Sequence, residues 1–198
     1  MGLNLNTASE AEQIAVVSLF GGHIERIDNP SEAVQMAAVQ STAWAIEFIK
    51  NPSEAVQLAA VRRSGDAFKY ISGITTPSEA VKLAAVQCSG EAIQHIKNPS
   101  DQVQLAAVQR HPFSISYITN PCEAAQIAAA RADTESILYL DDPTHRAAMI
   151  AFLNMIESGR YNRGTDREFL IDQLQRIHRL HPDWDELYTI ANDLGVDL

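Results

Sequence analysis

Cysteine is scarce in this chain of 198 residues. Its two cysteines, Cys88 and Cys122, have no Cys-x-x-Cys pairing and no histidine/cysteine cluster around them. Zinc and iron–sulfur sites therefore have no support in the sequence, and we expect no cofactor. The low cysteine content is typical of proteins from a reducing compartment.

Long apolar runs and targeting signals are lacking as well. No stretch reaches the roughly 18 apolar residues of a membrane-spanning helix. Residues 1–8 have neither the basic region nor the apolar core of a signal peptide. We therefore expect a soluble protein without membrane contact, in the cytoplasm of a bacterium or, if its origin is viral, of the host cell.

Basic residues are fewer than acidic ones. The chain has 15 lysines and arginines against 25 acidic residues, a net charge of −10, which disfavours binding to a phosphate backbone. Between Gly164 and Leu198, eight acidic residues and three arginines give a net charge of −5. This segment is either a solubilising cap or an acidic surface that mimics nucleic acid or docks on a basic protein.

What the chain does have is an internal repeat of about 22 residues. The stretch Asn51-Pro-Ser-Glu-Ala-Val-Gln-Leu-Ala-Ala-Val61 recurs almost unchanged. We number the copies repeat 1 to repeat 7, starting at Thr7, Asn29, Asn51, Thr76, Asn98, Asn120 and Asp142. Repeat 3 is 25 residues long, because it contains an extra Gly73-Ile74-Thr75. Such a repeat predicts a stacked array whose terminal copies are atypical, since they face water.

The first eleven positions of the repeat predict a helix. Asn, Thr or Asp at position 1 is a good N-cap, proline at position 2 suits the first turn, and an acidic residue at position 4 can bond back to the cap and favours the helix dipole. Positions 6 and 8–11 are apolar and are predicted to form the core. Glycine at position 15, as in Gly21, Gly65 and Gly90, predicts a left-handed residue that ends the helix.

A second, shorter element is predicted to follow the position 15 turn, at positions 17–22, as in Ala92–Lys97. Positions 18 and 21 are apolar, as in the pairs Ile46/Ile49, Phe68/Ile71, Ile93/Ile96, Ile115/Ile118 and Ile137/Leu140. Six or seven residues fit a short α or 3₁₀ helix. The fold class is therefore all-α: a solenoid of about seven helix–turn–short-helix repeats.

Repeat 7 loses the pattern after about Phe152, and the array is predicted to occupy residues 1–159. Two helices, at about 165–180 and 183–194, are predicted for residues 160–198. We expect them to form a C-terminal cap over the last repeat.

The repeats resemble the leucine-rich repeat variant group, in which short bacterial repeats alternate an α-helix with a 3₁₀-like helix in a right-handed superhelix. They look closer still to a bacterial and phage class of repeats that read helix, then Gly-x-Ala-Leu/Ile. The matching stretches are Val56–Val61 and Ser89–Ile93, and the resemblance extends over about residues 7–153. It implies the fold and transfers no catalytic residue. The cysteine cluster of the founding member has no counterpart here.

Two sets of positions are candidate partner-binding surfaces. Position 20 is aromatic or histidine in five repeats, at Phe48, Tyr70, His95, Tyr117 and Tyr139. Its rings form either a binding stripe or packing between neighbouring repeats. Positions 13–16 vary most between copies, and repeat arrays usually place specificity on one loop edge. The candidates there are Trp44, Arg63, Arg110, His111 and Phe113.

The polar columns have a simpler interpretation. Position 7 is glutamine in five repeats, and position 12 holds Gln40, Arg62, Gln87, Gln109 and Arg131. Such columns can read nucleobases, one repeat per base, but that normally needs a basic groove. We expect a solvated polar helix face instead.

Catalytic motifs are missing from the sequence. The six histidines fall at unrelated repeat positions, and although His178 and His181 are three residues apart, their spacing dictates no third ligand. No Ser/His/Asp order, phosphate loop or carboxylate pair stands out. We therefore expect a non-enzymatic protein-binding scaffold or adaptor. The alternatives are an acidic, phage-type inhibitor of a host nucleic-acid-processing or defence complex, an enzyme that uses an unrecognised pocket, and a homo-oligomer.

Overall fold

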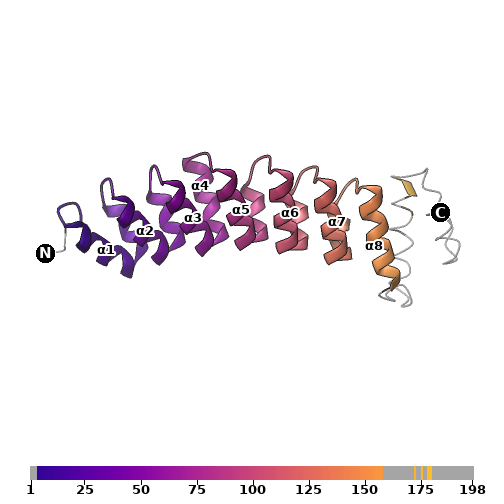
Figure 1. Ribbon diagram of the computed structural model, residues 1–198, viewed down its shortest axis with the longest axis horizontal. Coiled ribbons are helices and arrows are strands. Elements are labelled where there is room, and N and C mark those ends of the chain that lie inside the picture. The colour runs from indigo at the N-terminus through magenta and orange to yellow at the C-terminus, as the bar shows by residue number, and fades with distance from the viewer. Residues whose placement is uncertain (1–3, 158–171, 173–174, 176–177, 180–198) are drawn as a thin grey trace. The chain divides into compact units, whose positions relative to one another are not determined.

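The computed structural model describes residues 4–157, 172, 175, 178 and 179, and the fold is all-α, with helices in a solenoid-like tandem arrangement (Figure 1). The chain divides into two compact units, Met1–Pro121 and Cys122–Leu198. The division falls inside repeat 6. The predicted boundary at residue 159 and the helix predicted at about 183–194 lie outside the described residues. Of the helix predicted at about 165–180, residues 172, 175, 178 and 179 are described, and all four are helical.

Each repeat of the first compact unit forms one long helix and one short 3₁₀ helix, as predicted. The long helices are α1 (Glu10–Leu19), α2 (Glu32–Ser41), α3 (Glu54–Arg63), α5 (Glu79–Cys88) and α6 (Asp101–Arg110). The 3₁₀ helices are η1 (Gly21–Arg26), η2 (Ala43–Phe48), η3 (Gly65–Ala67), η4 (Gly90–His95) and η5 (Pro112–Tyr117). In repeat 3, η3 runs directly into α4 (Phe68–Ile74). Successive long helices of this unit pack side by side (Figure 1).

The second compact unit repeats the same design. Its described elements are α7 (Glu123–Ala132), η6 (Thr134–Tyr139) and α8 (His145–Glu157), which pack on one another. Hydrogen bonds join its repeats. Asn154 Nδ2 donates to Ala130 O at 3.1 Å, and the Thr144 N–H donates to Gln126 Oε1 at 2.6 Å.

Each of the first five long helices begins later than the Asn-Pro motif predicted. The N-cap is the serine at position 3, whose Oγ accepts from the backbone N–H three residues on. The prediction that position 1 caps the helix is therefore wrong. Asn29, Asn98 and Asn120 instead have φ angles of 52°, 49° and 55°, a left-handed conformation that asparagine tolerates better than most residues. The asparagine makes the turn, and the serine starts the helix.

The position 4 carboxylate bonds to the next repeat rather than back to its own cap. The hydroxyls of Ser31, Ser53, Ser78 and Ser100 donate to the carboxylates of Glu10, Glu32, Glu54 and Glu79, respectively. We call this set the serine–glutamate ladder. Each ladder serine accepts a hydrogen bond from its own helix and donates one to the preceding repeat, so it joins helix initiation to repeat stacking.

In repeat 1, the position 3 serine bonds to a carboxylate of its own helix. The hydroxyl and backbone N–H of Ser9 donate to Glu12 Oε2, at 2.7 and 2.8 Å, in a capping box. These hydrogen bonds, that of the hydroxyl above all, hold the pKa of Glu12 below its usual range. Glu12 is exposed, whereas Val34 and Val56 at the same position are fully buried. Glu12 thus replaces the usual valine because its carboxylate accepts the hydrogen bonds of the N-cap residue Ser9.

The predicted core is confirmed at positions 6, 10, 11, 18 and 21, which are buried in repeats 2–5. Positions 8 and 9 differ from the prediction, because Leu58 and Ala59 are only half-buried. The glutamines of position 7 are not a solvated face either. Gln57 and Gln104 are each 7% exposed. Their Nε2 atoms donate to the carbonyl oxygens of position 2, which are those of Pro52 and Pro99, at 3.0 Å.

The glycines of position 15 serve close packing rather than a left-handed turn. None of Gly21, Gly65 and Gly90 has φ in the left-handed region, so that prediction is wrong. A Cβ on Gly21 would clash with the Ala38 carbonyl oxygen, and one on Gly90 would lie 2.6 Å from that of Ala107. The 3₁₀ helix of one repeat therefore approaches the long helix of the next closely enough to exclude a side chain.

The position of the helix cap is open to a direct test. Ser53→Ala removes both the cap of α3 and the ladder bond to Glu32, and should lower the free energy of unfolding by about 1–2 kcal/mol. Asn51→Ala, two residues earlier at an exposed position, should change it by less than about 0.5 kcal/mol. Urea denaturation followed by circular dichroism measures both. The reverse order of effects would contradict the assigned cap.

Candidate functional site

The variable edge of positions 13–16 lies where each long helix ends and its 3₁₀ helix begins. The residue between them is extended, as in Phe20 and Thr42, and its N–H still bonds back to the long helix, at 3.2 and 2.8 Å. At this edge position 15 is buried in repeats 1–4, whereas positions 13 and 14 are exposed or half-buried in repeats 1–5. Leu19 is 88% exposed, Phe20 51% and Trp44 39%.

Four rings of repeats 1 and 2 pack together at this edge. The Phe20 ring centroid lies 5.2 Å from that of His23 and 6.3 Å from that of Trp44, and Trp44 lies 5.7 Å from Phe48. All three contacts are edge-to-face, a favourable arrangement for aromatic rings. We call Phe20, His23, Trp44 and Phe48 the N-terminal aromatic cluster.

The local sequence makes room for this cluster. Gly22 lies under Trp44, since a Cβ there would come within 2.6 Å of the indole ring. Packing of η1 on η2 brings the two repeats together. The cluster is therefore built on backbone that the repeat already fixes.

The structure brings some predicted site residues together. Trp44 contacts Phe48, and His111 lies 6.0 Å from Phe113, measured between ring centroids. Arg63 reaches the end of α2, where its Nη2 donates to the Ser41 carbonyl oxygen at 2.9 Å. Arg110 is exposed beside His111 on the same edge, in repeat 5.

The other position 20 residues are more scattered. Tyr70 is half-buried, with the Lys69 Nζ 4.7 Å from its ring centroid, and His95 is also half-buried. Tyr117 and Tyr139 are 48% and 58% exposed, and they belong to different compact units. Neither Tyr70 nor His95 contacts another ring among the described residues. A continuous aromatic stripe therefore stays a prediction.

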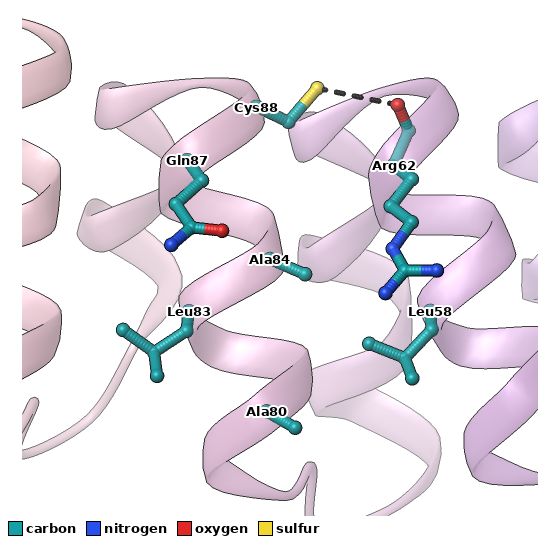
Figure 2. Close-up of a pocket in the computed structure, with 7 residues that line it drawn as sticks. All are labelled: Leu58, Arg62, Ala80, Leu83, Ala84, Gln87 and Cys88. Carbon is teal, nitrogen blue, oxygen red and sulfur yellow. Dashed lines mark hydrogen bonds between the residues drawn. The ribbon is translucent and has the colours of Figure 1, made fainter.

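Sequence reasoning missed a groove between α3 and α5. It has a volume of about 460 Å³ and is lined by Leu58, Arg62, Ala80, Leu83, Ala84, Gln87 and Cys88 (Figure 2). These are residues of positions 5, 8, 9, 12 and 13. The first four positions follow one another at helical spacing, i, i+3, i+4 and i+7, so they form one stripe on each long helix. Because position 8 is apolar in every repeat, the sequence predicts Leu58 and Leu83 as core rather than as groove lining.

The described residues contain neither a group of metal ligands nor a helix that could span a membrane. Within residues 4–157 and the four later described positions, no three His, Cys, Asp or Glu residues are grouped so as to hold a metal ion. In the same residues, no helix is long and apolar enough to cross a membrane.

Comparison with known proteins does not identify a family for the chain. No protein-family model, curated protein or solved structure matches the chain. The resemblance to the leucine-rich repeat variant group stays a prediction.

Proposed function

We propose that the protein is a non-enzymatic scaffold that binds a partner protein through its variable edge, with the N-terminal aromatic cluster as the anchor. The observation that supports this most is the adjacent exposure of Leu19, Phe20 and Trp44 on one edge. Large apolar side chains gathered on a surface mark interaction sites, and tryptophan is enriched among the residues that dominate binding energy.

The packing of the cluster favours binding. Its edge-to-face contacts restrict the rings before a partner is bound, so less side-chain entropy is lost on association. The exposed faces of Phe20 and Trp44 would be covered, at a gain of about 25 cal/mol per Å² of apolar surface buried. The rest of the edge varies between repeats, which suits it to select among partners.

Affinity capture with a paired variant tests this function. The protein, immobilised, is exposed to lysate of the cells that express it, alongside a Phe20→Ser/Trp44→Ser variant. We expect at least one protein to be retained by the wild type and to fall about tenfold or more with the variant. Leu153→Ser, which removes another exposed large apolar residue outside the edge, is the matched control. Identical capture by the edge variant would refute the proposal.

Salt dependence separates this function from the acidic inhibitor. An apolar anchor should keep the complex intact at 1 M salt, where charges are screened within about 3 Å. Dissociation at that concentration, together with displacement by DNA or RNA, would instead support an acidic mimic of nucleic acid.

A further inference from the structure

The groove between α3 and α5 shares no residue with the N-terminal aromatic cluster. Figure 2 shows Leu58 and Leu83 at the same level on neighbouring helices, with Ala84 above and Ala80 below the gap between them. Both leucines are half-buried, and Ala80 is exposed. The floor of the groove is thus apolar surface that the fold has not covered.

Cys88 closes the upper end of the groove. Its thiol donates to the Arg62 carbonyl oxygen at 3.7 Å, a contact that joins the C-terminal ends of α3 and α5 (Figure 2). The groove is therefore bounded by two helices that are tied together, rather than by a mobile loop. Its volume of about 460 Å³ falls within the range of about 300–1,000 Å³ typical of ligand sites.

Charges at the lower end of the groove are already satisfied. Glu54 accepts the hydroxyl hydrogen of Ser78 in the serine–glutamate ladder. Glu79 pairs with Lys82, whose Nζ lies 3.5 Å from its carboxylate. Neither carboxylate needs a partner from outside.

Arg62 is different. Its guanidinium lies beside Leu58 on the groove wall, and it has no hydrogen-bond or ion-pair partner among the described residues (Figure 2). It is also the only charged residue in the groove lining. Arginine pairs with carboxylates through two parallel hydrogen bonds, and next to an apolar surface such a pair is less screened than in open water.

We propose that this groove binds a segment of a partner protein in which an aliphatic side chain stands beside a carboxylate. The aliphatic group would lie on Leu58 and Leu83, and the carboxylate would pair with Arg62. This inference rests on the proposed scaffold function and specifies the chemistry of a second contact surface. The groove is open, since all of its lining residues are exposed or half-buried. A segment of a partner protein can therefore lie along the two helices without entering a closed cavity.

The repeat itself supplies test variants that should fold. Position 12 is glutamine in repeats 2, 4 and 5, so Arg62→Gln removes the charge and restores the common residue. Position 5 is Gln102 in repeat 5, so Ala80→Gln fills the groove with a side chain that the repeat accepts. Ala55→Gln makes the same change at the exposed position 5 of repeat 3, outside the groove lining. Lys97→Gln removes an exposed charge elsewhere.

The probe is a random dodecapeptide phage library, selected on the wild-type protein and depleted on Ala80→Gln. We expect the enriched peptides to place leucine, isoleucine or methionine next to aspartate or glutamate. Synthetic copies, measured by fluorescence anisotropy, should bind Arg62→Gln and Ala80→Gln about tenfold or more weakly than wild type. Affinity for the Ala55→Gln and Lys97→Gln controls should stay within about twofold of wild type.

Enriched peptides that are basic, or failure to enrich any peptide that distinguishes the wild type from Ala80→Gln, would overturn the proposal. So would a wild-type dimer, seen in analytical ultracentrifugation, that Ala80→Gln dissociates, since the occupant would then be a second copy of the chain. If binding survives both groove variants but is lost with Phe20→Ser/Trp44→Ser, the groove proposal fails and the scaffold function stands. If neither surface retains a peptide or a protein, both fail.

Discussion

Replacing Phe68 with alanine should lower the free energy of unfolding by about 3–5 kcal/mol, the range for truncating a buried phenylalanine. Phe68 is 1% exposed and begins α4, the helix that occurs only in the long repeat of the described chain. That helix packs on η2 and η4 of the neighbouring repeats. Loss of the ring leaves a cavity where three repeats meet, in the middle of the first compact unit.

Phe68→Ile is the matched variant, because isoleucine occupies position 18 in Ile46, Ile93 and Ile115. It should cost much less than alanine, since most of the apolar volume is kept. Urea denaturation gives the free energies, and hydrogen exchange should show faster opening of repeats 3 and 4 in the alanine variant. A loss of less than about 1 kcal/mol for Phe68→Ala would mean that the site collapses and that α4 is dispensable.

Alanine at two glycines should change stability in opposite directions. Gly90→Ala should cost about 1–3 kcal/mol, because the new Cβ would lie 2.6 Å from both the Ala107 carbonyl oxygen and Ser114 Oγ. The carbonyl cannot move away freely, since it accepts the His111 N–H at 2.9 Å.

Gly73→Ala should instead stabilise the protein by about 0.4–1 kcal/mol. Gly73 is exposed in α4, and a Cβ there would meet nothing within 4 Å. Alanine therefore adds no clash and reduces the freedom of the unfolded chain. Thermal and urea denaturation of both variants would show the contrast. Equal effects of the same sign would contradict the close packing between repeats.

Much of the fold could be predicted from the sequence, because the same choices recur in every repeat. Apolar residues at positions 18 and 21, three apart, predicted the short helix that the structure shows as 3₁₀. Valine at position 6 and alanine at position 10 are fully buried in repeats 2–5, as expected. Repetition is informative here because each of these buried positions is apolar in all of repeats 2–5.

The sequence does not determine a structural role that two neighbouring residues, or two conformations, could equally fill. Asparagine and serine are both good N-caps, so Asn51-Pro-Ser53 offers two helix starts that only the backbone path distinguishes. Glycine likewise permits either a left-handed turn or close packing. At Gly90 the structure shows close packing, to a residue seventeen positions later in the chain.

The candidate surfaces were predicted unevenly. Variation between copies indicated the edge that contains Trp44, and the contact of Trp44 with Phe20 required coordinates. The groove could not be predicted, because positions 5, 6 and 8–11 of α3 are all apolar and leave no polar residue to mark the exposed stripe. The one feature of the sequence that could have drawn attention to the groove is Arg62, because position 12 is more often glutamine.

The central claim is that the N-terminal aromatic cluster contacts a partner protein. Fluorine NMR of 5-fluorotryptophan in a Trp184→Phe background tests it most directly, since Trp44 is then the only tryptophan of the chain. Trp44 is 39% exposed, so its resonance should differ between light and heavy water in the free protein. We predict that the captured partner shifts this resonance and removes most of the solvent isotope effect. An unchanged resonance in the saturated complex would contradict the account.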